Sequence, residues 1–189
     1  MRIGGGVARG RTVKTPPGGR TRPTSDLVRG AIFSMLAARG ADLSCILDLY
    51  AGSGALGIEA LSRGGEWCDF VERDPRACTT IRENLQATGF ADRGAVHCVD
   101  AKQLVTRLGG GPYTVVLADP PYADEASGDV VTEVARSPLV AGGAILVWER
   151  SSREPRPERV GLFDCIAERR HGDTVILLYA RGDVREGSA

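Results

Sequence analysis

The chain has 189 residues, of which 42% are hydrophobic and 25% charged, as is ordinary for one globular domain. This composition excludes a collagen-like chain, a disulfide scaffold and a wholly disordered protein. No apolar run approaches the roughly 20 residues of a membrane span, and the N-terminus lacks the apolar stretch of a secretory signal. We therefore expect a cytoplasmic protein with no membrane partner.

Positive charge is concentrated near the N-terminus. The whole chain has 24 Lys+Arg and 24 Asp+Glu, but residues 1–30 hold seven basic residues against the single acid Asp26. A basic segment joined to an acidic body favours a polyanionic partner, although a solvated tail explains the charge equally well. The seven basic residues are Arg2, Arg9, Arg11, Lys14, Arg20, Arg22 and Arg29.

The predicted elements begin after this segment. Residues 1–24 are rich in glycine and proline, and we expect an arm with one small hairpin there. A capped helix is predicted over residues 27–38, after which strands and helices alternate. The predicted strands cover 45–51, 67–72, 95–99, 113–119 and 144–149, the helices cover 55–63, 75–88, about 101–108 and about 127–136, and a final hairpin pairs 162–170 with 173–181.

This alternation predicts an α/β fold with a largely parallel, seven-stranded sheet and an antiparallel C-terminal hairpin. The expected organisation is a basic arm over 1–24, one domain over 25–181 and a tail over 182–189. Sites in such sheets lie beyond the carboxyl ends of the strands, so strand-terminal residues are the candidates. The five cysteines form no C-x-x-C pair and there are only two histidines, so no metal site is expected.

A glycine turn follows the first predicted strand. Gly52, Gly54 and Gly57 match G-x-G-x-x-G, and Glu72 ends the next strand. This pattern also fits a dinucleotide-binding oxidoreductase, so alone it is ambiguous. Asp48, at the end of the first strand, would repel a pyrophosphate and attract the sulfonium of S-adenosylmethionine.

Acidic residues end four of the strands. Each could singly be a helix cap or a solvated carboxylate, but four at one edge suit a cationic adenosyl ligand, with Asp100 placed for the adenine amino group. The four acids are Asp48, Glu72, Asp100 and Asp119. Together they predict S-adenosylmethionine as the cofactor.

The most specific motif is Asp119-Pro120-Pro121-Tyr122, directly after the fourth strand. The lone pair of a nucleobase amino group is delocalised into the ring, so the amine is a poor nucleophile. The Asp119 carboxylate and the Pro120 carbonyl can each accept one N–H and aim the lone pair at a methyl group. The prolines stiffen the turn, and Tyr122 offers a face on which an extruded base stacks. We therefore predict amine methylation carried by these four residues, through positioning and without a metal.

These motifs resemble a known superfamily. Residues 48–64, 70–74 and 119–122 are similar to class I S-adenosylmethionine-dependent methyltransferases, which have a Rossmann-like fold. Residues 2–18 and 21–36 resemble a narrower group, the bacterial RsmD-type small-subunit ribosomal RNA guanine-N2 methyltransferases. The resemblance implies methylation of a guanine N2 amine in 16S ribosomal RNA, at guanine 966. It also implies small-subunit ribosomal RNA or the assembling subunit as partner, and a monomer.

The resemblance further implies roles for individual residues. Asp48, Gly52 and Gly54 would hold the methionine part of the cofactor, Glu72 the ribose and Asp100 the adenine. The full implied cofactor set is Asp48, Ala51, Gly52, Ser53, Gly54, Glu72, Arg73, Asp100 and Ala101. The implied RNA-phosphate contacts are Arg9, Arg11, Lys14, Arg20, Arg22 and Arg29. Two residues depart from the family pattern: Gly30 replaces a better helix former, and Leu27 a basic residue.

Three alternatives stay open. D-P-P-Y is shared with DNA adenine-N6 and cytosine-N4 amino methyltransferases, although this chain has no segment long enough for a separate base-reading domain. The glycine turn admits an NAD-dependent oxidoreductase, although no substrate domain is visible. A non-enzymatic RNA-binding module with the same fold is the third alternative.

Overall fold

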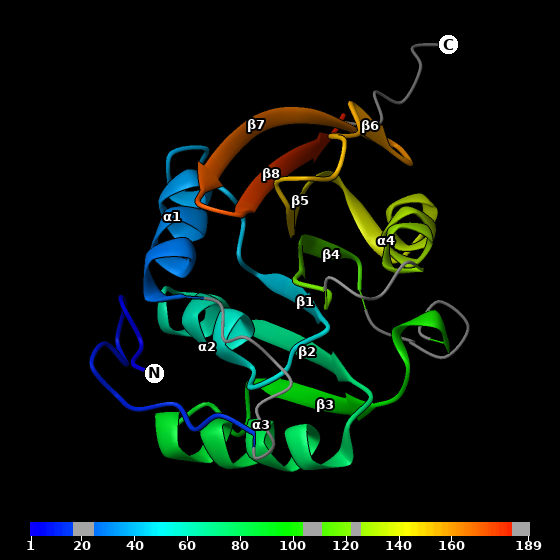
Figure 1. Ribbon diagram of the computed structural model, residues 1–189. Coiled ribbons are helices and arrows are strands. Elements are labelled where there is room, and N and C mark those ends of the chain that lie inside the picture. Colours follow the sequence, from blue (N-terminus) through cyan, green and yellow to red (C-terminus); the bar gives the residue numbers. More distant parts are fainter. Residues whose placement is uncertain (17–24, 104–110, 122–125, 183–189) are drawn as a thin grey trace, which may run out of the picture.

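The computed structural model describes residues 1–16, 25–103, 111–121 and 126–182. Thirteen elements follow one another along this part of the chain (Figure 1). In order they are α1 (Asp26–Ala37), β1 (Cys45–Leu49), α2 (Ala55–Ser62), β2 (Trp67–Glu72), α3 (Pro75–Thr88), β3 (Gly94–Cys98), the 3₁₀ turn η1 (Ala101–Gln103), β4 (Tyr113–Ala118), α4 (Ser127–Arg136), β5 (Val140–Ser151), β6 (Arg159–Val160), β7 (Phe163–His171) and β8 (Thr174–Arg181). Of the helix predicted near 101–108, η1 is described and residues 104–108 lie outside the described part.

The strands form one sheet in the order β3-β2-β1-β4-β5-β8-β7-β6. β1 to β5 are parallel to one another, whereas β8, β7 and β6 are antiparallel to their neighbours. The predicted fold class is thus confirmed. The described sheet has one strand more than the seven expected, because the two-residue β6 pairs with the start of β7. A strand of two residues is too short to show a period-2 pattern.

Helices cover both faces of the sheet, and each face has its own apolar core. Residues of α1, α2 and α3 pack in the first cluster, against strand residues such as Ile46, Leu117 and Val147. α4 packs in the second cluster, against alternate strand residues such as Leu47 and Val116. Figure 1 shows α4 across the sheet from α1. The central strands β1, β4 and β5 are therefore covered on both sides, as parallel strands require.

The described part of the arm is packed against the domain. Arg2 and Thr12 form an antiparallel bridge, as the expected small hairpin requires, and Ile3, Ala8 and Val13 are buried. Backbone hydrogen bonds tie the arm to α2 and α3: for example, the N–H of Val7 donates to the carbonyl of Ser62 (2.8 Å), and that of Lys14 to Oδ1 of Asn84 (2.9 Å). Residues 1–16 are consequently part of the folded core.

No described helix combines the length and the apolar character that a membrane crossing demands.

Candidate functional site

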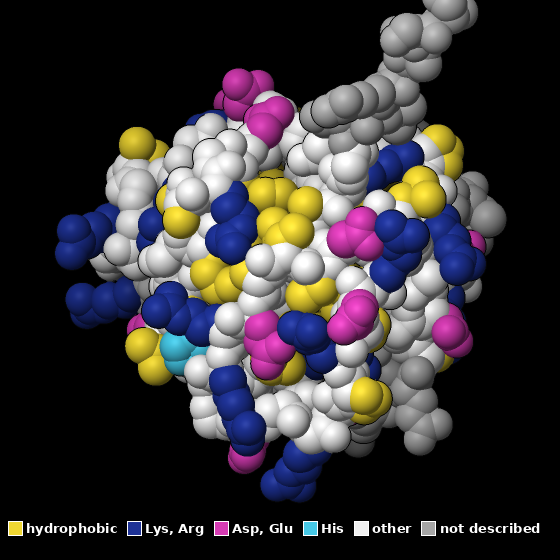
Figure 2. Space-filling model, turned by 90° about the horizontal axis from the view of Figure 1, so that it is seen from above, with side chains coloured by type: hydrophobic (Ala, Val, Ile, Leu, Met, Phe, Trp, Pro, Cys, Tyr) yellow, Lys and Arg dark blue, Asp and Glu magenta, His cyan; other side chains and the backbone are white. Residues whose placement is uncertain are grey.

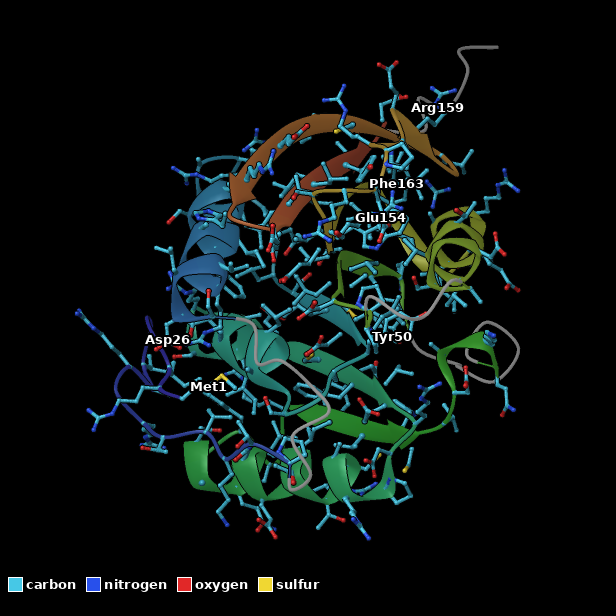
Figure 3. All side chains as sticks on the ribbon, in the orientation of Figure 1. Met1, Asp26, Tyr50, Glu154, Arg159 and Phe163 are labelled. Carbon is cyan, nitrogen blue, oxygen red and sulfur yellow. The ribbon has the colours of Figure 1, made fainter. Side chains whose placement is uncertain are left out.

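The chain leaves β1 through a turn with unusual backbone geometry. Tyr50, Gly52 and Gly54 have φ angles of 60°, 55° and 77°, so three left-handed residues occur within five positions. A non-glycine residue with positive φ is uncommon and costs energy, and such strain concentrates at functional sites. Figure 3 labels Tyr50 at the point where the chain leaves β1. The turn leads directly into α2, whose N-cap is Gly54.

The last glycine of the motif sets how closely α2 packs on the sheet. A Cβ at Gly57 would lie 2.4 Å from Phe70 and 2.6 Å from the Cys68 sulfur of β2, so no larger residue fits there. The N–H of Gly57 donates to Oδ2 of Asp48 (2.9 Å). Asp48 therefore fixes the helix start as well as lining the site, a structural role that the sequence did not reveal.

Asp48 is 1% exposed, and no Lys or Arg in the described part of the chain forms an ion pair with it. The pKa of its carboxyl is raised to about 7, chiefly by burial and also by the nearby Asp119 and Glu72, against a lowering by the Gly57 hydrogen bond. These acids are close enough to repel one another. The site therefore favours either a proton or an external cation.

Glu72, at the end of β2, bridges two turns of the site. Its Oε2 accepts the N–H of Gly52 (2.9 Å) and its Oε1 accepts the N–H of Asp74 (2.8 Å). Carboxylate oxygens have further lone pairs, so both can still accept ligand hydroxyls. Next along this edge, Oδ1 of Asp100 accepts the N–H of Lys102 (2.9 Å). Its Oδ2 lies 3.9 Å from Nη1 of Arg73.

Asp119, Pro120 and Pro121 follow β4, which lies beside β1 in the sheet. The parallel register pairs Asp48 with Leu117, so Asp119 lies two positions further along the same edge. Tyr122, the fourth residue of the motif, lies outside the described residues. The predicted cofactor and acceptor residues are thus brought to one edge from adjacent strands.

One cavity of about 920 Å³ joins these residues, a volume within the range of ligand sites. It is lined by most of the predicted set: Asp48, Ala51, Gly52, Ser53, Glu72, Arg73, Asp100, Ala101, Asp119, Pro120 and Pro121. Gly54 does not line it, because this residue is turned toward Ile81 of α3. The cavity is long and extends beyond Asp119 to other elements.

Sequence reasoning missed the far end of this cavity. Glu149, Arg170, His171 and Thr174 line it, together with residues of the α1 N-terminus. Because β8 is antiparallel to β5, the β7–β8 turn returns to the carboxyl edge of the parallel strands. The hairpin signal at His171-Gly172 was the available clue, since it places this turn at the site edge once the strand order is known.

The prediction that Arg29 contacts RNA needs correction. It is 1% exposed, and its guanidinium donates to Glu59 Oε2 (3.1 Å), Asp26 Oδ1 (2.9 Å) and the Arg2 carbonyl (2.5 Å). Figure 3 shows Asp26 near the N-terminal Met1, at this junction of arm and α1. A buried, fully engaged guanidinium cannot reach a phosphate, so Arg29 joins arm to domain instead.

The remaining basic residues of the arm differ in environment. Arg9 and Arg11 are exposed and form no ion pair with the described residues, whereas Lys14 pairs with Glu83 (2.9 Å). Arg20 and Arg22 lie outside the described residues. On the face above the C-terminal hairpin, Figure 2 shows basic side chains interleaved with acidic ones. There Arg159 pairs with Asp164 (2.7 Å) and Arg156 with Glu168 (3.4 Å).

No group of three or more metal-ligating side chains was found among the described residues.

Comparisons with known proteins agree with this geometry. The chain is 31% identical over 189 residues to the Ribosomal RNA small subunit methyltransferase D of Escherichia coli (strain K12), covering 100% of this chain and 94% of that protein. The solved structure of yhhF from Escherichia coli has a TM-score of 0.84 at 31% identity, covering 97% of this chain and 98% of that one.

A more distant neighbour shares the fold. An RNA methyltransferase from Salinibacter ruber, solved with S-adenosyl-L-homocysteine, has a TM-score of 0.60 at 19% identity, covering 88% of this chain and 98% of that one. The family model described as Conserved hypothetical protein 95 matches residues 1–180. The chain therefore belongs to the Conserved hypothetical protein 95 family, which includes the RsmD-type methyltransferases that its sequence resembles.

Proposed function

We propose that this protein transfers a methyl group from S-adenosylmethionine to the exocyclic N2 amine of a guanine in small-subunit ribosomal RNA. The observation that carries the proposal is the acid-lined cavity, in which Asp48 and Asp119 from adjacent strands face one space. The name of the Escherichia coli relative supports ribosomal RNA as the substrate. The family resemblance supplies the guanine N2 and position 966.

The residues around the glycine turn fit the cofactor. Asp48 would face its cationic half, the backbone of Ala51, Gly52 and Ser53 would approach its methionine part, and Glu72 would accept hydrogen bonds from the ribose hydroxyls. The adenine would lie by Asp100 and Ala101, with Arg73 beside them at the cavity wall. When bound, the cofactor supplies a methyl group on a positively charged sulfur. Attack on it neutralises charge, so the acids need only seat the cation and exclude water.

The acceptor amine would be held by the D-P-P-Y turn. Asp119 and the carbonyl of Pro120 would each accept one N–H of the amine, Pro121 would keep the turn stiff, and Tyr122 would stack on the extruded base. The nitrogen held here would receive the methyl group that the bound cofactor supplies. The amine proton would then leave readily, to Asp119 or to solvent, so Asp119 need not be a strong base.

RNA would be held by the basic arm. Arg9 and Arg11 are exposed for phosphate contacts, and we keep Lys14, Arg20 and Arg22 in the proposed set. Phosphate contacts release counterions, so the affinity for RNA should fall steeply with salt. The protein would act as a cytoplasmic monomer, with the arm over 1–24, the catalytic domain over 25–181 and a tail over 182–189.

The test is methyl transfer from labelled S-adenosylmethionine to naked small-subunit RNA, to small subunits lacking the modification, and to duplex DNA. We expect N2-methylguanosine in one of the RNA arms, found by mass spectrometry of the digested nucleosides. Asp119→Ala should abolish it while the protein still folds and still binds the cofactor. Methylation of DNA alone, binding of NAD in place of S-adenosylmethionine, or RNA binding without turnover would each overturn the proposal in favour of an alternative.

A further inference from the structure

Glu149 of β5 lies beside Asp119 at the far end of the cavity. The parallel register pairs Leu117 with Val147 and Ala118 with Trp148. One further step along both strands places Asp119 opposite Glu149. Neighbouring strands are about 4.8 Å apart, so the two carboxyl groups start from adjacent backbone positions.

Both residues also belong to the same face of the sheet. Leu117 and Val147 pack in the cluster under α1, α2 and α3, whereas Ala118 and Trp148 pack in the cluster on the α4 side. Because side chains alternate along a strand, Asp119 and Glu149 return to the face of Leu117 and Val147. Glu149 is 7% exposed and lines the cavity. The carboxylates of Asp119 and Glu149 thus start from neighbouring positions on one face of the sheet and line one cavity.

We propose that Glu149 determines the specificity for guanine by accepting the N1–H of the base while Asp119 holds its N2 amine. This inference deepens the proposed function and depends on it. Guanine presents N1–H and the N2 amine as adjacent donors, which match adjacent carboxylates. Adenine and cytosine carry a ring-nitrogen acceptor beside their exocyclic amine, and that lone pair would face the Glu149 carboxylate without a hydrogen bond.

The end of β7 supplies hydrogen-bond donors. Arg170 and His171, its last two residues, line the same cavity. Nε2 of His171 is shielded from solvent, and none of the described residues hydrogen-bonds to it. The other edge of guanine, O6 and N7, consists of acceptors. A base in this cavity would present donors to Asp119 and Glu149 and acceptors to Arg170 and His171.

The decisive probe is RNA in which the methylated guanine is replaced by 2-aminopurine. This base keeps the N2 amine, but its N1 is an acceptor and carries no hydrogen. The carrier is whichever of naked RNA or small subunit the preceding experiment shows to be methylated, assembled from a synthetic fragment. We expect wild type to prefer guanine strongly. Glu149→Gln should lower the ratio of kcat/KM for guanine to that for 2-aminopurine, because an amide can donate to N1 or accept from N1–H.

Glu149→Ala should lower kcat/KM on guanine by roughly 10- to 100-fold, the range of one well-placed base contact, and should leave cofactor affinity unchanged. The matched control is Glu168→Gln, which alters an exposed carboxylate of β7 paired with Arg156 and should change neither quantity. Glu149→Gln changes the shape little, so its melting temperature checks the fold.

An unchanged base ratio in Glu149→Gln, or a loss of cofactor affinity parallel to the loss of activity, would overturn the role of Glu149. Failure of the wild type to methylate any guanine would instead overturn the proposed function, before the analogue is used. The two failures are therefore distinguishable.

Discussion

Glu59 and Asp48 are both 1% exposed carboxylates on the same side of the sheet, but their surroundings differ. Glu59 of α2 accepts hydrogen bonds from Nε of Arg29 (3.1 Å), from Nε of Arg63 (2.7 Å) and from the N–H of Gly4 (2.8 Å). Asp48 of β1 accepts one backbone N–H and has other acids nearby, and burial raises its pKa to about 7.

The difference separates structure from function. A buried acid that two arginines compensate within the chain is complete and ties elements together, here the arm, α1 and α2. A buried acid without a basic partner among the described residues is costly on its own, so it indicates a site that an external cation completes. Glu59 is of the first kind, and Arg29 of α1, which the sequence suggested for RNA contact, is one of the two arginines that compensate it. Asp48, on β1, belongs to the second kind.

Removal of the compensated acid, Glu59, tests most directly whether this difference between Glu59 and Asp48 is real. Glu59→Ala removes the buried carboxylate that pairs with Arg29 and leaves, among the described residues, only the exposed carboxylate of Asp26; breaking a buried ion pair costs about 3–5 kcal/mol. We expect the free energy of unfolding to fall by that amount in urea denaturation. The control Glu168→Gln, at an exposed pair, should change it by less than about 1 kcal/mol. A loss as small as the control's would mean that the Arg29–Glu59–Arg63 cluster does not anchor the arm.

The uncompensated acid, Asp48, should make the free energy of unfolding depend on pH. The pKa of Asp48 rises from 3.8 to about 7 on folding, so between these values the folded protein holds a proton that the unfolded chain has released. The free energy of unfolding therefore falls as pH rises through this window, by up to about 1.4 kcal/mol per pH unit, and levels off above about pH 7.

Asp48→Asn removes this titration, so the difference in unfolding free energy between the two proteins isolates it. Measured from pH 4 to pH 8, the variant should gain stability relative to wild type as pH rises. A constant difference over this range would show that Asp48 is as well compensated as Glu59, which would break the comparison.

Asp48→Asn also tests whether the charge of Asp48 binds the sulfonium of the cofactor. In Asp48→Asn the amide side chain keeps an oxygen for the N–H of Gly57 but cannot attract a sulfonium. We expect the affinity for S-adenosylmethionine to fall roughly 10- to 100-fold, or about 1.4–2.7 kcal/mol, by calorimetry at pH 8. Affinity for S-adenosylhomocysteine, whose sulfur is uncharged, should fall less. Equal losses of affinity for both ligands would mean that Asp48 maintains the shape of the turn and does not attract the cofactor through its charge.

Much of the fold could be predicted because its signals are local. The strand and helix periods, the glycine turn after β1 and the hairpin near Gly172 depend on neighbouring residues, and the acids that end strands follow from knowing that parallel strands share an edge. The sequence predicts the fifth strand over 144–149, whereas β5 extends further at both ends, over Val140–Ser151.

What could not be predicted depends on contacts distant in sequence. Arg29 looked like a surface charge because its partner Glu59 is 30 residues away and its carbonyl partner Arg2 is 27 residues away. Glu149 and His171 look ordinary until the strand order β4-β5-β8-β7 brings them to the site. Charge and hydropathy along the chain say which groups are polar, but not which partners the topology gives them.

The smallest effect concerns Gly30, next to Arg29 in α1. A Cβ at this position would meet nothing within 4 Å, and alanine is the better helix former, so Gly30→Ala should stabilise the protein by about 0.5–1 kcal/mol in urea denaturation. If the ion-pair cluster anchors α1 independently of its helix propensity, the gain should be the same in Glu59→Ala. A gain that disappears in that background would show that α1 no longer docks as a helix once its buried acid is gone.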